Sequence, residues 1–233
     1  MRQINPEHIS VNAISILGDA RDFSDNHKGR KYSSSQTGVF RFLFFLFFTF
    51  FVPTTLIWLE IIPFKYRFYV FFLTLMGFFF YCFLRRYSFY ELGFRTDNLS
   101  NSLHWNLLFC AVGAVCLYIT CKAGILRPRN ANYLPYAYAA YIFLLGPVQE
   151  VVFRGILFAE MKRIRVLDCR WIPVLSTLPF CFLHIIYRQP SLLLITFISG
   201  IVWGVIFRKW PNIWGISVSH SLLGSLAMFL GVI

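Results

Sequence analysis

The sequence predicts an all-α protein: a polytopic transmembrane helix bundle of about seven (six to eight) spans, preceded by a polar N-terminal extension. First, 58% of the 233 residues are hydrophobic, 28 are Phe, and the mean hydropathy is +0.61, which is more apolar surface than a soluble domain of this size can bury. Second, several stretches reach the roughly 20 apolar residues that a helix needs to cross a bilayer. Third, the alternating pattern of a membrane β-barrel is absent.

Residues 1–37 form the polar extension. They lack the short basic start and immediate apolar core of a secretory signal, so we expect a solvated tail or a surface-lying segment. Residues 27–31 and Arg41 are basic beside the first hydrophobic run. Basic residues next to a span favour the cytoplasmic side and can contact anionic lipid.

The hydrophobic runs divide into N-terminal transmembrane helices, residues 38–90, and a core, residues 91–233. The loops near residues 85–95, 162–170 and 208–209 are richer in Lys and Arg than the alternate loops, which predicts a cytoplasmic N-terminus in an inner or plasma membrane. The predicted spans are about 39–62, 68–84, 103–122, 133–158, 171–187, 191–207 and 212–232.

The net charge of +12 is explained by this orientation, and membrane lipid is the expected partner rather than nucleic acid. The six Cys are scattered without CxxC spacing, which gives no pattern for a zinc site or a disulfide framework. Neither GxGxxG nor GxxxxGK[ST] occurs, so no phosphate-binding loop is indicated. We expect no metal and no cofactor, and the sequence leaves the oligomeric state open.

The chain is organised around residues 146–155, an apolar run that contains Gln149, Glu150 and Arg154. Ionisable side chains at bilayer depth are costly and indicate a functional site. Glu150 and Arg154 are spaced i, i+4, so they share one helix face and can neutralise each other.

Two histidines are predicted at similar depth in other spans. At 1.5 Å per residue, Glu150 lies roughly 15 Å, His184 roughly 20 Å and His220 roughly 12 Å from the basic ends of their helices. Either histidine alone is explained by burial in a helix seam with a hydrogen bond to a neighbouring helix. Together with Glu150 and Arg154, they indicate a site near the midplane.

A carboxylate with histidines suits acid and base work on a water molecule, and a further donor can stabilise an oxyanion, so hydrolysis of a peptide bond fits. Ser217, Ser219, Ser221 and Ser225 surround His220 in sequence, but no GxSxG motif accompanies them. A zinc peptidase would need HExxH or a favourable meeting of three helices. Proton or ion transport through Glu150 is a third possibility.

These residues resemble the CAAX protease and bacteriocin-processing family, also called Abi. The resemblance rests on Glu150 to Gly155, on Phe180 to His184 and on His220, with Glu91 to Phe94, Gly200 to Gly204 and Ile213-Trp214 as supporting features. It implies an intramembrane, glutamate-dependent endopeptidase without a bound metal, whose site opens toward the cytoplasm and the membrane. It also implies a membrane-associated peptide or protein as substrate.

The resemblance assigns roles by position. In the EExxxR motif the first Glu, with the FxxxH histidine, His184, activates water, while Glu150 and Arg154 support them. The final HxxxN or HxxxD motif supplies oxyanion donors through His220 and the residue at position 224. Phe153, Phe180 and Gly224 are the expected substrate-binding or supporting residues.

The chain departs from the family pattern at two positions. Gln149 replaces the first Glu, and Gly224 replaces the Asn or Asp. A neutral amide cannot accept a proton at working pH, although it can orient water. Either Glu150 has taken the base role with His184, or the site is catalytically silent. The sequence therefore predicts a peptidase of this family, with a silent peptide-binding, immunity or signalling scaffold as the alternative.

Overall fold

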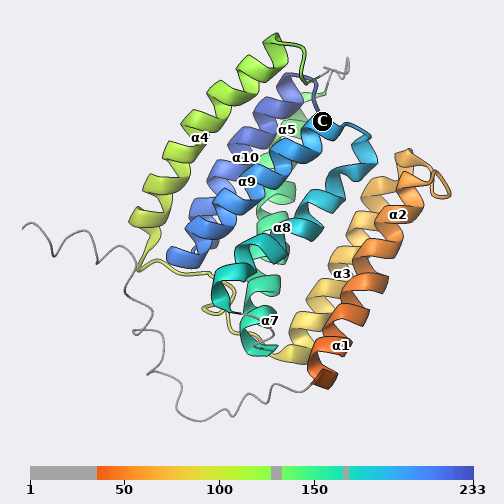
Figure 1. Ribbon diagram of the computed structural model, residues 1–233, viewed down its shortest axis with the longest axis vertical. Helices are drawn as coiled ribbons and strands as arrows, with labels where there is room; N and C mark the ends of the chain where they lie inside the picture. The colour runs from red at the N-terminus through yellow and green to blue at the C-terminus, as the bar shows by residue number, and fades with distance from the viewer. Residues whose placement is uncertain (1–35, 127–132, 165–167) are drawn as a thin grey trace, which may run out of the picture. The chain divides into compact units, whose positions relative to one another are not determined.

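The computed structural model describes residues 36–126, 133–164 and 168–233, and these are helical with connecting loops and no strand (Figure 1). The all-α prediction is confirmed. Among the described residues, six helices are long and apolar enough to cross a membrane, which makes the chain an integral multi-pass membrane protein. The predicted extension falls almost wholly outside the described residues.

The six candidate spans match the first six predicted stretches. Their bounds are Thr37–Trp58, Phe64–Arg85, Leu99–Lys122, Pro135–Ile164, Cys169–Tyr187 and Pro190–Lys209. The seventh predicted stretch is the shorter apolar helix α10, Ile213–Phe229. This helix has 17 residues. The described residues therefore contain six spans without α10 and seven with it, and both numbers lie within the predicted range of six to eight.

Several spans are made of consecutive helical segments. The first consists of α1 (Gln36–Leu46), a π-helical turn η2 (Phe47–Phe51) and α2 (Val52–Trp58). The second is a short 3-10 turn, η3 (Phe64–Tyr66), followed by α3 (Arg67–Arg85), and the third is the single helix α4 (Leu99–Lys122).

The fourth span has five segments: α5 (Pro135–Ala140), η4 (Tyr141–Leu145), α6 (Gly146–Glu150), η5 (Val151–Ile156) and α7 (Leu157–Ile164). The segments η4 and η5 are π-helical, so a wider turn lies on each side of α6. Pro147 in α6 cannot donate a backbone N–H, which favours an altered turn before it. Such turns rotate the side chains of α6 relative to a regular helix.

The fifth span begins with η6 (Cys169–Trp171), continues as α8 (Ile172–Leu183) and ends in the 3-10 turn η7 (His184–Tyr187). It is followed by α9 (Pro190–Lys209) and α10. In Figure 1, α1, α2 and α3 form one flank and α4 the other, and α8, α9 and α10 lie between them. The fourth span contacts a central helix and a flanking helix, since α10 packs on α6 and η4, and α3 packs on η5.

Glycines let α8 and α9 approach closely. A Cβ on Gly200 would lie 2.6 Å from Cγ2 of Thr177, and one on Gly204 would lie 2.9 Å from Cα of Pro173. Gly200 and Gly204 have the i, i+4 spacing of small residues at membrane helix interfaces, where packing rather than the hydrophobic effect drives association. The close approach brings the backbone of Gly200 near the centre of the bundle.

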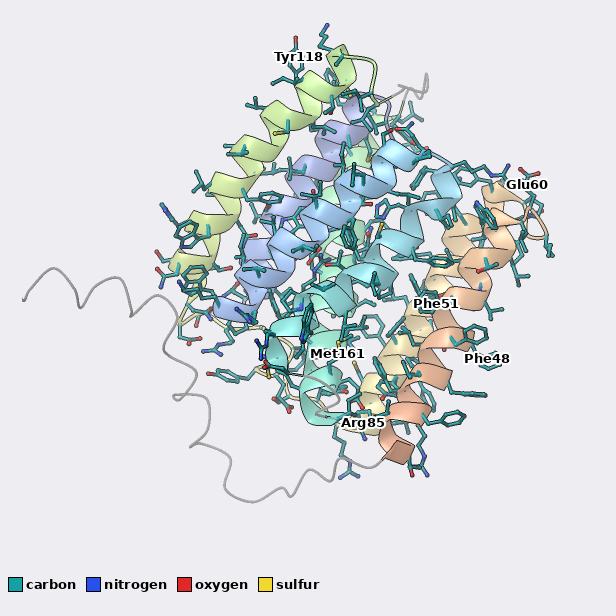
Figure 2. All side chains as sticks on the ribbon, in the orientation of Figure 1. Phe48, Phe51, Glu60, Arg85, Tyr118 and Met161 are labelled. Carbon is teal, nitrogen blue, oxygen red and sulfur yellow. The ribbon has the colours of Figure 1, made fainter. Side chains whose placement is uncertain are left out.

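One end of the bundle is held by ion pairs. Arg85 of α3 donates to Glu160 of α7 at 3.1 and 2.8 Å, and Tyr87 also donates to Glu160. Arg163 pairs with Glu91 at 2.8 Å. Partial burial raises the pKa of Glu91, but hydrogen bonds from Ser88 and the contact with Arg163 outweigh it and hold that pKa below its ordinary value. Figure 2 shows Arg85 at this end, and Glu60 and Tyr118 toward the opposite end.

Gly204→Val is expected to destabilise the protein by about 1–3 kcal/mol, because the added side chain overlaps the backbone of Pro173. The measurement is the thermal unfolding midpoint of the purified protein in detergent. Val205→Ala is the matched control, since the neighbouring side chain is 46% exposed and lies outside that contact. Equal midpoints for Gly204→Val and wild type would contradict the packing described.

Candidate active site

The centre of the bundle holds a fully buried charged cluster from two helices. Glu150, the last residue of α6, has no exposed area, and its Oε1 accepts from Nη1 of Arg154 at 3.0 Å. The same Oε1 lies 2.5 Å from Nδ1 of His220 in α10. The predicted i, i+4 pair is therefore present, and His220 meets it as the depth estimate predicted. A carboxylate only accepts, so Nδ1 of His220 carries a hydrogen.

Arg154 extends the cluster to α9. Its Nη2 donates to the carbonyl oxygen of Gly200 at 3.1 Å, which the close approach of α8 and α9 makes possible. Its guanidinium lies 4.4 Å from the ring centre of Phe180 and 5.7 Å from that of Trp203. Cation–π contacts of this kind stabilise a desolvated guanidinium. The charge of Arg154 is thus balanced by one carboxylate, one carbonyl and two aromatic faces.

Aromatic rings fix the orientation of His220. Trp203 stacks on its imidazole with a centroid distance of 4.8 Å and an interplanar angle of 24°. Phe180 meets the same imidazole edge-on at 5.5 Å. Trp203 is itself held by a hydrogen bond of 3.0 Å from its Nε1 to the hydroxyl of Ser219. His220 therefore has one position, set by packing as well as by Glu150.

His184 is the first residue of η7, and it belongs to a different set of contacts. Its Nδ1 lies 3.0 Å from the carbonyl oxygen of Phe180. Because a carbonyl can only accept, Nδ1 is the protonated nitrogen, and Nε2 of the neutral ring is a hydrogen-bond acceptor and a base. The ring also packs on Phe180 at 5.2 Å. Phe180 thus links the two histidines, since both imidazoles contact its ring.

A cavity of about 370 Å³ lies beside these residues. His184, Gln149 and Tyr141 line its inner part, and each is only 8% exposed. The lining continues to Phe68 and Tyr136, which are 54% and 71% exposed, so the cavity runs to the surface near the first residues of α3 and α5. Its mouth is therefore at the opposite end from the ion pairs of Glu160. The rest of the wall is mainly apolar, with α2, α3 and α5 contributing most of it.

The neighbours Gln149 and Glu150 face different surroundings. Gln149 lines the cavity, and its Oε1 is a buried oxygen without a hydrogen-bond partner among the described residues. Glu150 does not line the cavity, and its Oε1 contacts Arg154 and His220. Consecutive helical residues differ by about 100° in direction, which explains the separation. The side chain that shares the cavity with His184 is the amide, not the carboxylate.

Gly224 leaves space that Tyr141 occupies. A Cβ at position 224 would lie 2.1 Å from the hydroxyl oxygen of Tyr141 and 2.2 Å from a ring carbon. That hydroxyl is 3.2 Å from Nε2 of His220. Any side chain at position 224 would therefore displace the Tyr141 ring from its contact with His220.

The remaining predicted residues have packing roles in the described structure. Phe153 is 1% exposed and meets the rings of Phe50 and Phe180 edge-on at 5.6 and 5.4 Å. Phe180 lies beneath Arg154. Neither ring lines the cavity. Two residues at this centre, Tyr141 and Trp203, are not among the predicted site residues. Trp203 lies within the stretch Gly200 to Gly204, and the sequence signal for Tyr141 is the missing side chain at Gly224, which leaves room for a large neighbour.

The serines near His220 are engaged elsewhere where the structure describes a partner. Ser219 accepts from Trp203, and Ser221 donates to the carbonyl oxygen of Ile142 at 2.9 Å. Across residues 36–126, 133–164 and 168–233, no three His, Cys, Asp or Glu side chains are grouped so that they could hold a metal ion. The functional groups that lie together at the centre are a carboxylate, a guanidinium, two imidazoles, an amide and a phenol.

The protein is therefore a multi-pass helix bundle with a buried polar cluster at its centre. Residues 131–226 match the family model described as type II CAAX prenyl endopeptidase Rce1-like. The match over residues 131–226 confirms the resemblance to the CAAX protease and bacteriocin-processing family. Searches of curated proteins and of solved structures found no match. The matched segment contains Gln149, Glu150, Arg154, His184 and His220.

Arg154→Met is expected to destabilise the protein by about 3–5 kcal/mol, because it leaves the buried carboxylate of Glu150 without its cationic partner. The double variant Glu150→Gln with Arg154→Met removes both charges and should recover part of that loss. Thermal unfolding in detergent measures both. A single variant as stable as wild type, or a double variant less stable than the single, would contradict the pairing.

Proposed function

We propose that the chain is an intramembrane endopeptidase that cleaves a membrane-associated peptide or protein in the cavity between Gln149 and His184. The family match supports the class of reaction, since Rce1-like membership suggests a CAAX protease type of peptidase. The observation that carries the proposal is the shared cavity wall of Gln149, His184 and Tyr141, next to the buried Glu150–His220 pair.

His184 is the base in the proposed mechanism. Its Nε2 takes a proton from a water molecule, and the amide oxygen of Gln149 accepts the second hydrogen of that water and orients it. The water oxygen forms a bond to the carbonyl carbon of the substrate. The carbon–nitrogen bond then breaks, and His184 returns its proton to the departing amine. Water is consumed, and no other co-reactant is needed.

Glu150 acts on His220 rather than on water in this proposal. Its carboxylate is paired with Arg154 and His220, and it is fully buried away from the cavity. The reaction is glutamate-dependent in the sense that Glu150 fixes the orientation and protonation of His220. The alternative base role for Glu150 would require its side chain to leave two partners, which is costly for a buried charge.

A second candidate is favoured by one observation: the cavity contains no carboxylate from α6, because Gln149 stands there. Without a strong base, the cavity can bind a peptide and leave it intact. This is the silent scaffold, a protein that binds a peptide for immunity or signalling. The two candidates share the binding site and differ in whether the bond breaks.

Purified protein in proteoliposomes is offered two probes: a short farnesylated peptide and an unlipidated transmembrane peptide. Wild type should cleave one of them slowly. His184→Ala should lower kcat by about 10²- to 10⁴-fold, because the base is lost, and Gln149→Glu should raise it. Phe143→Ala is the matched control, since this residue of the same span is 81% exposed.

Equal rates for wild type and His184→Ala would overturn the peptidase proposal. Binding of a probe by wild type without cleavage, with cleavage gained in Gln149→Glu, would establish the silent scaffold instead.

We also infer that the N-terminus is cytoplasmic, so that the cavity mouth faces away from the cytoplasm. The end that carries the ion pairs has more basic residues than the end with the cavity mouth. The positive-inside rule therefore places the ion-pair end in the cytoplasm. An active site open to the cytoplasm, as the resemblance implies, would require the reverse orientation. The basic residues compared are Arg85, Arg86, Arg95, Lys162, Arg163, Arg170, Arg208 and Lys209 at one end and Lys65, Arg67, Lys122 and Arg188 at the other. In the sequence, the connection after Lys122 adds Arg127 and Arg129 to the second set, which remains the smaller.

Membrane-impermeant maleimide applied to intact cells should label Glu60→Cys and leave Phe89→Cys unlabelled. Both side chains are exposed, at opposite ends of the bundle. Wild-type protein gives the background from its own cysteines. Labelling of Phe89→Cys alone would contradict the inferred orientation and make the cavity cytoplasmic.

A further inference from the structure

Tyr141 connects the buried cluster with the cavity. It is the first residue of η4, it lines the cavity, and its hydroxyl lies 3.2 Å from Nε2 of His220. His220 is only 3% exposed and does not itself line the cavity. A substrate in the cavity therefore meets the phenol of Tyr141 before it can meet the imidazole.

The glycine at position 224 makes this arrangement possible. The Tyr141 ring fills the place of the missing side chain, since a Cβ there would lie 2.1 Å from its hydroxyl oxygen. The residue that Gly224 replaces in the family pattern is a hydrogen-bond donor or acceptor on α10. A hydroxyl from η4 now occupies that side of His220.

Two proton arrangements satisfy the contacts of His220. When the ring is neutral, Nδ1 donates to Glu150, and Nε2 accepts the hydrogen of Tyr141. When the ring is an imidazolium, both nitrogens donate, and the hydroxyl oxygen of Tyr141 accepts from Nε2. The hydroxyl hydrogen of Tyr141 is then no longer held by Nε2 of His220, and Tyr141 is a residue of the cavity wall.

The imidazolium arrangement matches an anionic transition state. Glu150, Arg154 and His220 then carry one negative and two positive charges, a net charge of +1 beside the cavity. An oxyanion formed from a substrate carbonyl would neutralise this charge. Fixed donors and charges of this kind stabilise a transition state more than the ground state.

We propose that the Tyr141 hydroxyl is the donor that the cavity gives to the oxyanion of a bound peptide, and that Glu150 and His220 position it. Tyr141 is a catalytic residue in this proposal because it touches the reacting carbonyl oxygen. This inference rests on the proposed peptidase function, and it adds a residue that neither the sequence motifs nor the family pattern contains.

Tyr141→Phe removes the hydroxyl and keeps the ring. It should lower kcat by about 10²- to 10³-fold with little change in KM, which is the usual effect of losing one oxyanion donor. Tyr138→Phe, one turn earlier on the same span and outside the cavity lining, is the matched control and should have wild-type kcat. Gly224→Asn combined with Tyr141→Ala places an amide donor in the vacated space and should recover activity relative to Tyr141→Ala alone.

A binding measurement separates this inference from the peptidase function. The probes are the transmembrane peptide and the same peptide with one amide replaced by a phosphinate, which imitates the tetrahedral anion. Tyr141→Phe should weaken phosphinate binding by about 10- to 100-fold and leave the unmodified peptide unaffected. If wild type cleaves neither probe and Tyr141→Phe still weakens phosphinate binding selectively, Tyr141 is an oxyanion donor but the protein is not a peptidase.

Two results would overturn the inference. One is a Tyr141→Phe variant whose kcat and phosphinate affinity both stay within about twofold of wild type. The other is a wild-type protein that binds the phosphinate peptide no more tightly than the unmodified peptide, because the cavity then offers an oxyanion no donor. The thermal unfolding midpoints of Tyr141→Phe and Tyr138→Phe are compared as well. Equal midpoints would show that a lower kcat in Tyr141→Phe alone is not caused by unfolding.

Discussion

The single oxygen Oε1 of Glu150, shared by Arg154 and His220, is the interaction on which the centre of the bundle depends. A buried carboxylate is costly unless its charge is balanced. Here Oε1 makes both contacts, since Oε2 of Glu150 has no hydrogen-bond partner among the described residues. The need for balance reaches beyond α6, because Arg154 needs a second acceptor and finds it at Gly200 of α9. The glycine spacing that allows α8 and α9 to approach therefore serves the ion pair as well as the helix packing.

The same pair determines what His220 can do. With Nδ1 committed to Glu150 and the ring stacked on Trp203, only Nε2 is left to act, and it faces Tyr141. His184 is oriented differently, by a backbone carbonyl of its own helix. Nδ1 of His220 thus donates to a carboxylate, and Nδ1 of His184 donates to a backbone carbonyl.

Much of this centre could be predicted from the sequence because it depends on regular helical geometry. The spacing of Glu150 and Arg154 fixes their shared face, and counting residues from the helix ends places His220 at the depth of Glu150. The helical architecture follows from composition and run length in the same way.

The cavity could not be predicted in this way. Its wall includes α2 and α3, which belong to the predicted N-terminal helices, residues 38–90, rather than to the predicted core. Contacts between spans distant in sequence, and the π turns on both sides of α6, leave no periodic signal. The partnership of Tyr141 with Gly224 is equally hidden, because it depends on an empty volume rather than on a residue type.

The two departures from the family pattern have unequal structural consequences. At position 224 the lost side chain is replaced in space by Tyr141, whose hydroxyl contacts the same histidine. At position 149 no carboxylate from elsewhere enters the cavity, and the nearest one is held by Arg154 and His220. In the proposed mechanism, the oxyanion therefore has a donor in Tyr141, whereas water activation relies on one imidazole and one amide. For a site of this composition we expect proton removal from water to limit the rate.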